Sequence, residues 1–300
     1  MNIKLNTKPT PLVSTIIPTY NHADYLGKAL QSVLNQTYDN FEVLVIDGNS
    51  NDNTTEVVNK FKDSRIKYFK IPNYGIIATS RNMGIRASSG EWIAFLDADD
   101  WWSKDKLKIC MEHSNNEVDL VYHDLKIVSQ KPSFFVRRKT RTRQLRKPVL
   151  IDLLLGGNII PNSSVVVRKE MLEKIGFIDE SKELVASEDY NTWLKISKFT
   201  DRFLYLPKSL GYYFINNQNI SKKDMSATYR KATDKFLSDL SSAQKIKLEA
   251  NYKYISARYD FLQSNFKKSK NNLLFVLKNG SLELKIKSLL MFLLIIISLK

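Results

Sequence analysis

Short apolar runs alternate with helical patterns over the first half of the chain. The β-rich runs are Val13 to Ile17, Glu42 to Ile46, Ile66 to Ile71 and Trp92 to Leu96. Between the first two, apolar residues recur at helical spacing from Leu26 to Leu34, which predicts a helix with one apolar face. Strands and helices in alternation predict an α/β fold with a mostly parallel, Rossmann-like central sheet flanked by helices.

The second half of the chain changes character twice. A strand-like run from Leu120 to Val128 is followed by residues 131–148, which carry eight Lys or Arg and no acid and are expected to form a loop. Mixed patterns then continue to Phe214. From about Ser221 the sequence is helical, rich in lysine and free of proline. We therefore expect an α/β domain over residues 1–220 and a basic helical region over residues 221–300.

The end of the helical region is strongly apolar. Residues 289–297 are nine consecutive apolar residues, far fewer than the roughly 20 that a membrane-spanning helix needs. Lys285 and Lys287 lie beside this run and would attract anionic lipid. A helix lying on a membrane surface fits this pattern. A buried terminal helix, or one packed against another subunit, fits it as well.

Charge and cysteine content narrow the setting. The net charge is +15, and residues 222–300 contribute +10 of it from 16 basic and six acidic side chains, so an anionic partner is expected. Nucleic acid, lipid headgroups, a nucleotide and a phosphorylated acceptor all meet that description. Cys110 is the single cysteine and the first residues lack a secretory pattern. The cytoplasm is the expected compartment.

Polar residues follow three of the predicted strands. Tyr20-Asn21, Asp47-Gly48 and Asp97-Ala98-Asp99 fall at carboxyl ends of strands, where open parallel sheets bind ligands. The carboxylates of Asp97, Asp99 and Asp100 would repel one another unless a cation or donor groups compensate them. Mg²⁺ and Mn²⁺ use such oxygens together with substrate phosphates. The alternative is that these acids cap a helix beginning near Ser103.

The ordered motifs resemble those of a known family. VSTIIPTYNHADYLGKALQSVLNQTYDNFEVLVIDGNSNDNT, followed by SRNMGIRASSGEWIAFLDADDWW, resembles glycosyltransferase family 2, the inverting transferases with the GT-A fold. ASEDYNTWLKI and LGYYFINNQNIS extend the resemblance to about Ser221. The resemblance implies a GT-A catalytic domain over residues 1–220, a nucleotide-sugar donor and Mn²⁺ or Mg²⁺ as cofactor.

The resemblance also implies a nucleotide site. Pro18, Thr19 and Tyr20 match the turn that lies against the base in the family. Asp47 matches the acid that accepts a hydrogen bond from the base, which suits a carboxylate because it only accepts. Arg81 matches an arginine near the diphosphate or base oxygens. Ordinary core packing of Tyr20, a turn-forming Asp47 and a solvated Arg81 are the alternatives.

Two further motifs imply the chemistry. Asp97 matches the family residue that contacts ribose, and Asp99 matches the metal ligand. Glu188 and Asp189 match an acidic pair at the start of a helix, in which the aspartate is the general base. The alternative is that both acids stabilise the helix N-terminus, with Ser187 as the N-cap.

Two positions depart from the family pattern. Phe214 and Asn216 stand where many relatives carry an arginine and a histidine, so the resemblance does not supply a second contact to metal or diphosphate. The alternative is that the carbonyl oxygen of Asn216 provides it, with lower affinity for a cation than a charged ligand. Gly48-Asn49 stands where Asp-Gly is frequent, which is a milder change. The first departure leaves open a homologue that binds nucleotide without catalysis.

Together these features predict an inverting, metal-dependent hexosyl- or N-acetylhexosaminyltransferase. Its donor would be UDP-linked and its acceptor a saccharide or lipid-linked saccharide of a bacterial surface polysaccharide, at the inner face of the cytoplasmic membrane. A nucleic-acid-binding protein would explain the charge but not the acidic crevice, and the basic segments lack an aromatic stacking platform. A sugar nucleotidyltransferase would need a glycine-rich loop after the first strand, where Pro18-Thr19-Tyr20-Asn21 stands. The sequence sets neither the sugar nor the oligomeric state.

Overall fold

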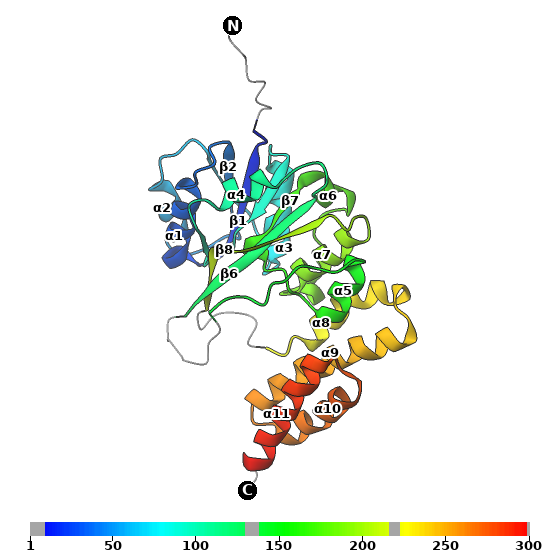
Figure 1. The fold of residues 1–300 in the computed structure, drawn as a ribbon. Helices are drawn as coiled ribbons and strands as arrows, with labels where there is room; N and C mark the ends of the chain where they lie inside the picture. The colour runs from blue at the N-terminus through cyan, green and yellow to red at the C-terminus, as the bar shows by residue number, and fades with distance from the viewer. Residues whose placement is uncertain (1–9, 130–137, 216–222, 299–300) are drawn as a thin grey trace. The chain divides into compact units, whose positions relative to one another are not determined.

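The computed structural model describes residues 10–129, 138–215 and 223–298 (Figure 1). The chain forms two compact units, each described here by itself. The first comprises Met1–Gln144, Ile159–Glu180 and Arg202–Asn216. The second comprises Leu145–Asn158, Ser181–Asp201 and Asn217–Lys300. Two segments that precede residue 220 therefore group with the C-terminal helices, while the division into functional domains stays a prediction.

One sheet organises the first unit. Its order is β3-β2-β1-β4-β7-β6-β8-β5. Pairings are parallel from β3 to β4 and between β6 and β8, and antiparallel at β4–β7, β7–β6 and β8–β5. The predicted mostly parallel α/β fold is confirmed. The strands are β1 (Val13–Thr19), β2 (Phe41–Asp47), β3 (Ile66–Lys70), β4 (Trp92–Phe95), β5 (Trp101–Trp102), β6 (Leu120–Ser129), β7 (Val166–Arg168) and β8 (Phe203–Ile215).

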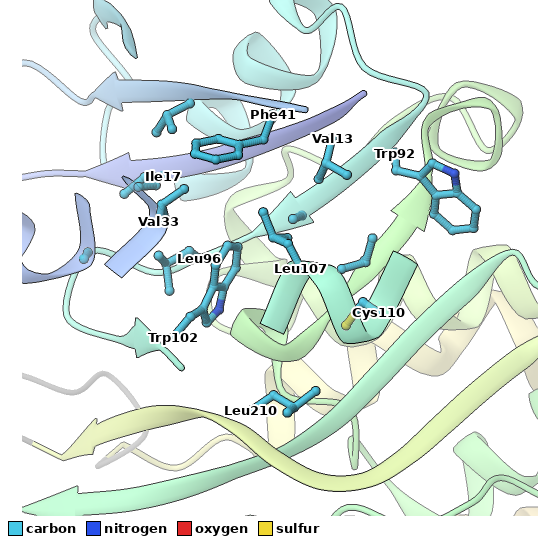
Figure 2. Close-up of a cluster of buried hydrophobic side chains, with 14 of the residues drawn as sticks. Val13, Ile17, Val33, Phe41, Trp92, Leu96, Trp102, Leu107, Cys110 and Leu210 are labelled. Atoms are coloured by element: carbon cyan, nitrogen blue, oxygen red, sulfur yellow. The ribbon is translucent and has the colours of Figure 1, made fainter. Parts of the chain in front are cut away.

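Alternate residues of each strand point to opposite faces of the sheet. The helices of the first unit cover these faces. On one face a core cluster gathers Val13 and Ile17 of β1, Val33 of α1, and Leu107 and Cys110 of α4 (Figure 2). The helices are α1 (Ala23–Leu34), α2 (Thr54–Asn59), α3 (Ile77–Ala87), α4 (Lys106–Glu112) and α6 (Lys169–Lys174), with a 3₁₀ turn η1 (Asn162–Ser164). The helix predicted from the apolar spacing between Leu26 and Leu34 is α1.

Helix α3 packs closely on the sheet through a glycine. A Cβ added at Gly84 would lie 2.7 Å from Cγ2 of Ile16, so any larger residue would force the helix outward. Ile16 is fully buried, and as the neighbour of Ile17 in β1 it points to the opposite face of the sheet. This close approach holds α3, which carries Arg81, against the central strands.

The second unit is helical. Ser241 is the N-cap of α9 and forms a capping box with Gln244. The Ser241 hydroxyl accepts from Gln244 N, and the Gln244 side chain accepts from Ser241 N. Ala257, Leu273 and Ile295 form a small buried core among its last three helices. The elements are α5 (Val149–Gly156), η2 (Lys182–Leu184), α7 (Glu188–Ser197), α8 (Ser226–Thr233), η4 (Asp234–Asp239), α9 (Ser242–Leu262), α10 (Phe266–Asn279) and α11 (Leu282–Ser298).

Candidate functional site

The acidic loop follows directly on β4. Asp97 and Asp99 are partly buried and Asp100 is 2% exposed. Strand β5 comes next, and α4 begins only at Lys106, with Asp105 at its N-cap. The interpretation of the three acids as caps of a helix near Ser103 is therefore wrong. Three carboxylates stand together at the end of a buried strand, where their mutual repulsion has to be offset.

Asp97 is fixed by three hydrogen bonds. Its Oδ1 accepts from a terminal guanidinium nitrogen of Arg81 at 2.8 Å and from Nδ2 of Asn162 at 3.0 Å. Its backbone N–H donates to Oγ of Ser163 at 3.1 Å. Arg81 was expected beside the nucleotide, and here its buried side chain neutralises Asp97. A contact of Arg81 with nucleotide stays a prediction.

The sequence analysis missed Asn162 and Ser163 as partners of Asp97. Both residues belong to η1. Nε1 of Trp102 donates to the backbone oxygen of Ser163 at 2.7 Å. The signal was the polar Asn-Ser-Ser run directly before a buried strand, since buried polar side chains are kept only where they find partners. Their distance of about 65 residues from Asp97 along the chain hid the contact.

The carboxyl of Asp100 is buried close to the charges of Asp97 and Asp99. Burial raises the pKa of its carboxyl well above the ordinary value, and the charges of Asp97 and Asp99 raise it further. Its Oδ1 accepts from the backbone N–H of Phe214 at 3.0 Å, which attaches β8 to the loop. Positive charge bound at this loop would relieve the repulsion that Asp100 experiences.

The residues present fit a divalent ion as partial ligands. Within the described ranges no group of three or more His, Cys, Asp or Glu side chains is arranged to hold a metal. Hard ions such as Mg²⁺ and Mn²⁺ commonly take one or two carboxylates and complete their shell with substrate phosphates and water. The excess negative charge that raises the pKa of Asp100 suits that mode of binding at Asp99.

Pro18, Thr19 and Tyr20 come at the carboxyl end of β1. The first two are buried, whereas Tyr20 is 53% exposed, so its ring is accessible to a flat ligand. Thr19 pairs in register with Asp47 on β2. Its hydroxyl is buried, with no hydrogen-bond partner among the residues that the structure describes. The exposed ring of Tyr20 is therefore the group at this strand end that a ligand can reach.

Asp47 is fully buried and organises the loop that follows it. Its Oδ1 accepts from the backbone N–H and hydroxyl of Ser50, at 2.8 and 2.6 Å. Its Oδ2 accepts from the hydroxyl of Tyr68 at 2.6 Å, and burial together with this bond raises the pKa of Tyr68 to about 12. The hydroxyl of Ser50 in turn accepts from Asn21 N. Asp47 thus links the loops after β1 and β2, while its contact with a base stays a prediction.

The two positions that depart from the family pattern, Gly48 and Phe214, have different roles in packing. A Cβ at Gly48 would lie 2.3 Å from Nδ2 of Asn73, so the glycine is needed for close packing there. The ring of Phe214 packs against Tyr25 and Trp101, with centroids 5.4 and 6.2 Å away. Phe214 therefore belongs to an aromatic cluster under the acidic loop. Asn216 lies outside the described residues.

The predicted catalytic acids lie in the second unit, at the start of α7. Ser187 occupies the N-cap position, but its side chain makes no capping bond. Asp189 Oδ1 accepts from Tyr190 N at 2.6 Å and Oδ2 accepts from Nδ2 of Asn158 at 3.1 Å. Glu188 is 5% exposed. Two donors orient the Asp189 carboxylate, and Asn158 is a partner that the sequence analysis missed.

Tyr229 also responds to Asp189. Burial raises the pKa of its phenol, and the charge of Asp189 raises it further. Its ring packs on Tyr190, with centroids 5.2 Å apart. The carboxylate thus lies in a polar and aromatic environment of α5, α7 and α8 rather than at a freely solvated helix end.

Part of the basic loop is compensated. Residues 130–137 lie outside the described residues. Nζ of Lys139 pairs with Asp124 at 2.8 Å in the first unit, and Arg146 pairs with Asp152 at 3.0 Å in the second. These two cations serve the fold, which lowers the charge that the segment offers to an anionic partner.

The mixed α/β sheet with its flanking helices has the architecture of the GT-A fold. The Glycosyl transferase family 2 model matches residues 14–176, and the chain belongs to that family. The UDP-Glc:alpha-D-GlcNAc-diphosphoundecaprenol beta-1,3-glucosyltransferase WfgD of Escherichia coli is 35% identical over 192 residues, which are 62% of this chain and 70% of the relative.

Solved structures agree on the fold. TarS residues 1–349 of S. aureus, in complex with UDP-GlcNAc, align with a TM-score of 0.64 at 21% identity, over 89% of this chain and 81% of that one. The mannosyltransferase PcManGT of Pyrobaculum calidifontis, in complex with GDP-Man and Mn²⁺, gives 0.63 at 18% identity, over 92% and 78%. The expectations of a family 2 member and of the GT-A fold with C-terminal helices are confirmed.

Proposed function

We propose that this glycosyltransferase moves a hexosyl or N-acetylhexosaminyl group from a UDP-sugar to a hydroxyl of a lipid-linked saccharide, with inversion, during synthesis of a bacterial surface polysaccharide. The observation that carries the proposal is the acidic loop, in which Arg81 and Asn162 hold Asp97 while Asp99 stands beside the buried Asp100. The glucosyl transfer to a diphosphoundecaprenol-linked sugar for which WfgD is named supports the acceptor class.

The donor is assigned to the carboxyl edge of β1, β2 and β4. The exposed ring of Tyr20 stacks on the base, with Pro18 and Thr19 behind it, and the buried hydroxyl of Thr19 gains a partner there. Asp47 accepts a hydrogen bond from the base, and Asp97 accepts from the ribose hydroxyls.

Asp99 is assigned to the metal, and Arg81 supplies fixed positive charge close to the diphosphate. Mn²⁺ or Mg²⁺ bound by Asp99 would neutralise the charge that develops on the leaving diphosphate. The oxygen-only donor set supports a hard divalent ion, and the mannosyltransferase solved with Mn²⁺ is consistent with that choice.

Asp189 is assigned as the general base, with Glu188 beside it. The acceptor hydroxyl attacks the anomeric carbon while its proton passes to Asp189, and the bond from that carbon to the diphosphate oxygen breaks. UDP leaves without needing an acid partner of the kind that glycosidases use. An α-linked donor would therefore yield a β-linked product. The hydrogen bonds from Asn158 and Tyr190 that orient the carboxylate support this assignment.

The proposed location is the inner face of the cytoplasmic membrane, because a lipid-linked acceptor is held there. Among the described residues no helix has the length and apolarity that crossing a bilayer demands. Attachment at the surface is the form of association that we propose.

A transfer assay tests the proposed function. Purified protein is incubated with UDP-glucose or UDP-GlcNAc, a GlcNAc-diphospholipid acceptor, and Mn²⁺ or EDTA. We expect transfer with Mn²⁺, a loss of more than about 100-fold with EDTA, and a similar loss in Asp99→Ala and Asp189→Ala. Asp105→Ala and Asp239→Ala are matched controls, because these carboxylates bond Thr37 and Lys198 at the surface. Full activity of either active-site variant would sink the role assigned to that residue.

A further inference from the structure

Helix α11 has two apolar faces. One packs inside the second unit, against α9 and α10 (Figure 1). There Ile295 is 1% exposed and joins Ala257 of α9 and Leu273 of α10. Met291 and Phe292 pack against the same core. The expectation of a packed terminal helix therefore accounts for one side of α11 only.

The other face is exposed. Leu282 is 74% exposed, Leu290 58% and Ile297 70%, and Ile286, Leu289 and Leu293 are exposed by about half. Successive helical residues are 100° apart, so these six side chains fall on one side of α11, roughly opposite Ile295. Water is in contact with a continuous strip of leucine and isoleucine, which soluble surfaces ordinarily avoid.

The surroundings of this strip are basic. Helices α10 and α11 carry six lysines and one acid, Glu283. Lys287 pairs with Glu283 within α11. On α10, Lys267, Lys268 and Lys278 are exposed, and Leu274 adds a further half-exposed apolar side chain. An apolar strip on a lysine-rich pair of helices is the composition of a segment that lies in the interface of an anionic bilayer.

We propose that the exposed face of α11 docks this transferase on an anionic lipid surface, with its apolar side chains in the interface and the lysines of α10 at the headgroups. The 17 residues of α11 span about 25 Å at 1.5 Å per residue, less than the roughly 30 Å of a bilayer's hydrocarbon core. Because its other face packs against α9 and α10, the helix lies along the surface. A second copy of the chain is a poorer occupant, because it would bring another +10 from residues 222–300 against the first. Docking through α11 would explain how the enzyme is held at the membrane face named in the proposed function. The docking proposal rests on the proposed function for its purpose and not for the binding itself.

Vesicle co-sedimentation tests the proposal with full-length protein and no acceptor. We expect binding to vesicles of 70% phosphatidylcholine and 30% phosphatidylglycerol, at least about tenfold weaker binding to pure phosphatidylcholine, and weaker binding in high salt. Leu293→Asp should lower binding by more than about tenfold. Ile246→Asp on α9, a 48% exposed apolar residue outside α11, is the matched control and should bind as the wild type does. Circular dichroism and Tm establish that both variants fold.

Two outcomes would overturn the proposal. One is vesicle binding of folded Leu293→Asp at wild-type strength. The other is a wild-type dimer, detected by light scattering, that Leu293→Asp converts to monomer while neither form binds vesicles. A water-soluble GlcNAc-diphosphate acceptor separates this test from the proposed function. Leu293→Asp should keep wild-type kcat on it, whereas a failed enzyme assignment would leave both proteins inactive and vesicle binding intact.

Discussion

A terminal guanidinium nitrogen of Arg81 lies 2.8 Å from Oδ1 of Asp97, and the Arg81 side chain is 4% exposed. A buried cation thus holds the first acid of the acidic loop in place. Since breaking a fully buried ion pair costs about 3–5 kcal/mol, and Asp97 is 28% exposed, we place the cost here at about 2 kcal/mol.

Arg81→Met should therefore lower the free energy of unfolding by about 2 kcal/mol and weaken donor binding, because Asp97 keeps its charge without its partner. Urea denaturation and titration with UDP measure the two effects. Arg86→Met is the matched control, since Arg86 lies exposed on the same helix over the ring of Phe177. The double variant Arg81→Met/Asp97→Asn should lose less than the sum of the single losses, and strict additivity would contradict the coupling.

Asp99→Asn should separate stability from function. Removing this charge relieves the repulsion on the buried Asp100, so the metal-free variant should be as stable as the wild type or up to about 1 kcal/mol more stable. Mn²⁺ with UDP should raise the Tm of the wild type and leave that of the variant unchanged, because a ligand stabilises only what binds it. Equal thermal shifts in both proteins would remove Asp99 from the metal site.

Asn158 should act as a positioning residue for Asp189. Losing its hydrogen bond frees the carboxylate to rotate, so Asn158→Ala should lower kcat by about tenfold with little change in the donor KM. Asn251→Ala controls for packing, since the Asn251 amide donates at a similar distance to Leu155 O in the same unit. Equal losses in both variants would indicate a general structural effect instead.

Lys106 should make stability depend on pH. Burial lowers its pKa to about 8, and the ordinary lysine value of 10.5 applies when the chain is unfolded. Between these pH values the unfolded state binds more protons, so stability rises with pH across that window. The gain approaches roughly 3 kcal/mol from 2.5 pKa units. Denaturation of wild type and Lys106→Met from pH 7 to 10.5 isolates this contribution, and parallel curves would contradict it.

The sequence predicted those features of the fold that depend on local pattern. Short apolar runs and the Leu26–Leu34 spacing predicted the strands and α1, because the burial of a segment is encoded locally. Ordered motifs singled out Asp97 and Asp189, whose roles stay predictions. Local pattern did not predict which side chains meet across long separations. Asn162 bonds Asp97 and Asn158 bonds Asp189 because loops fold back, and no periodicity records such contacts.

The sequence also did not predict the environment of some buried charged residues. Lys106 lies under the ring of Trp102 at 3.7 Å from its centroid and is fully buried, although a lysine in an amphipathic pattern ordinarily indicates a solvated position. Asp47 likewise bonds Ser50 and Tyr68 through its two oxygens, partners that no local pattern specified, while its contact with a base stays a prediction. Such partners are set by tertiary packing, which the sequence pattern does not specify.

The exposed strip on α11 has a kinetic consequence. An enzyme docked through this helix meets a lipid-linked acceptor at a surface density and not at a bulk concentration. Its rate would then fall when inert lipid is added at constant total acceptor, since the two molecules are diluted in two dimensions. Six leucine and isoleucine side chains would in this way make the composition of the bilayer a regulator of turnover.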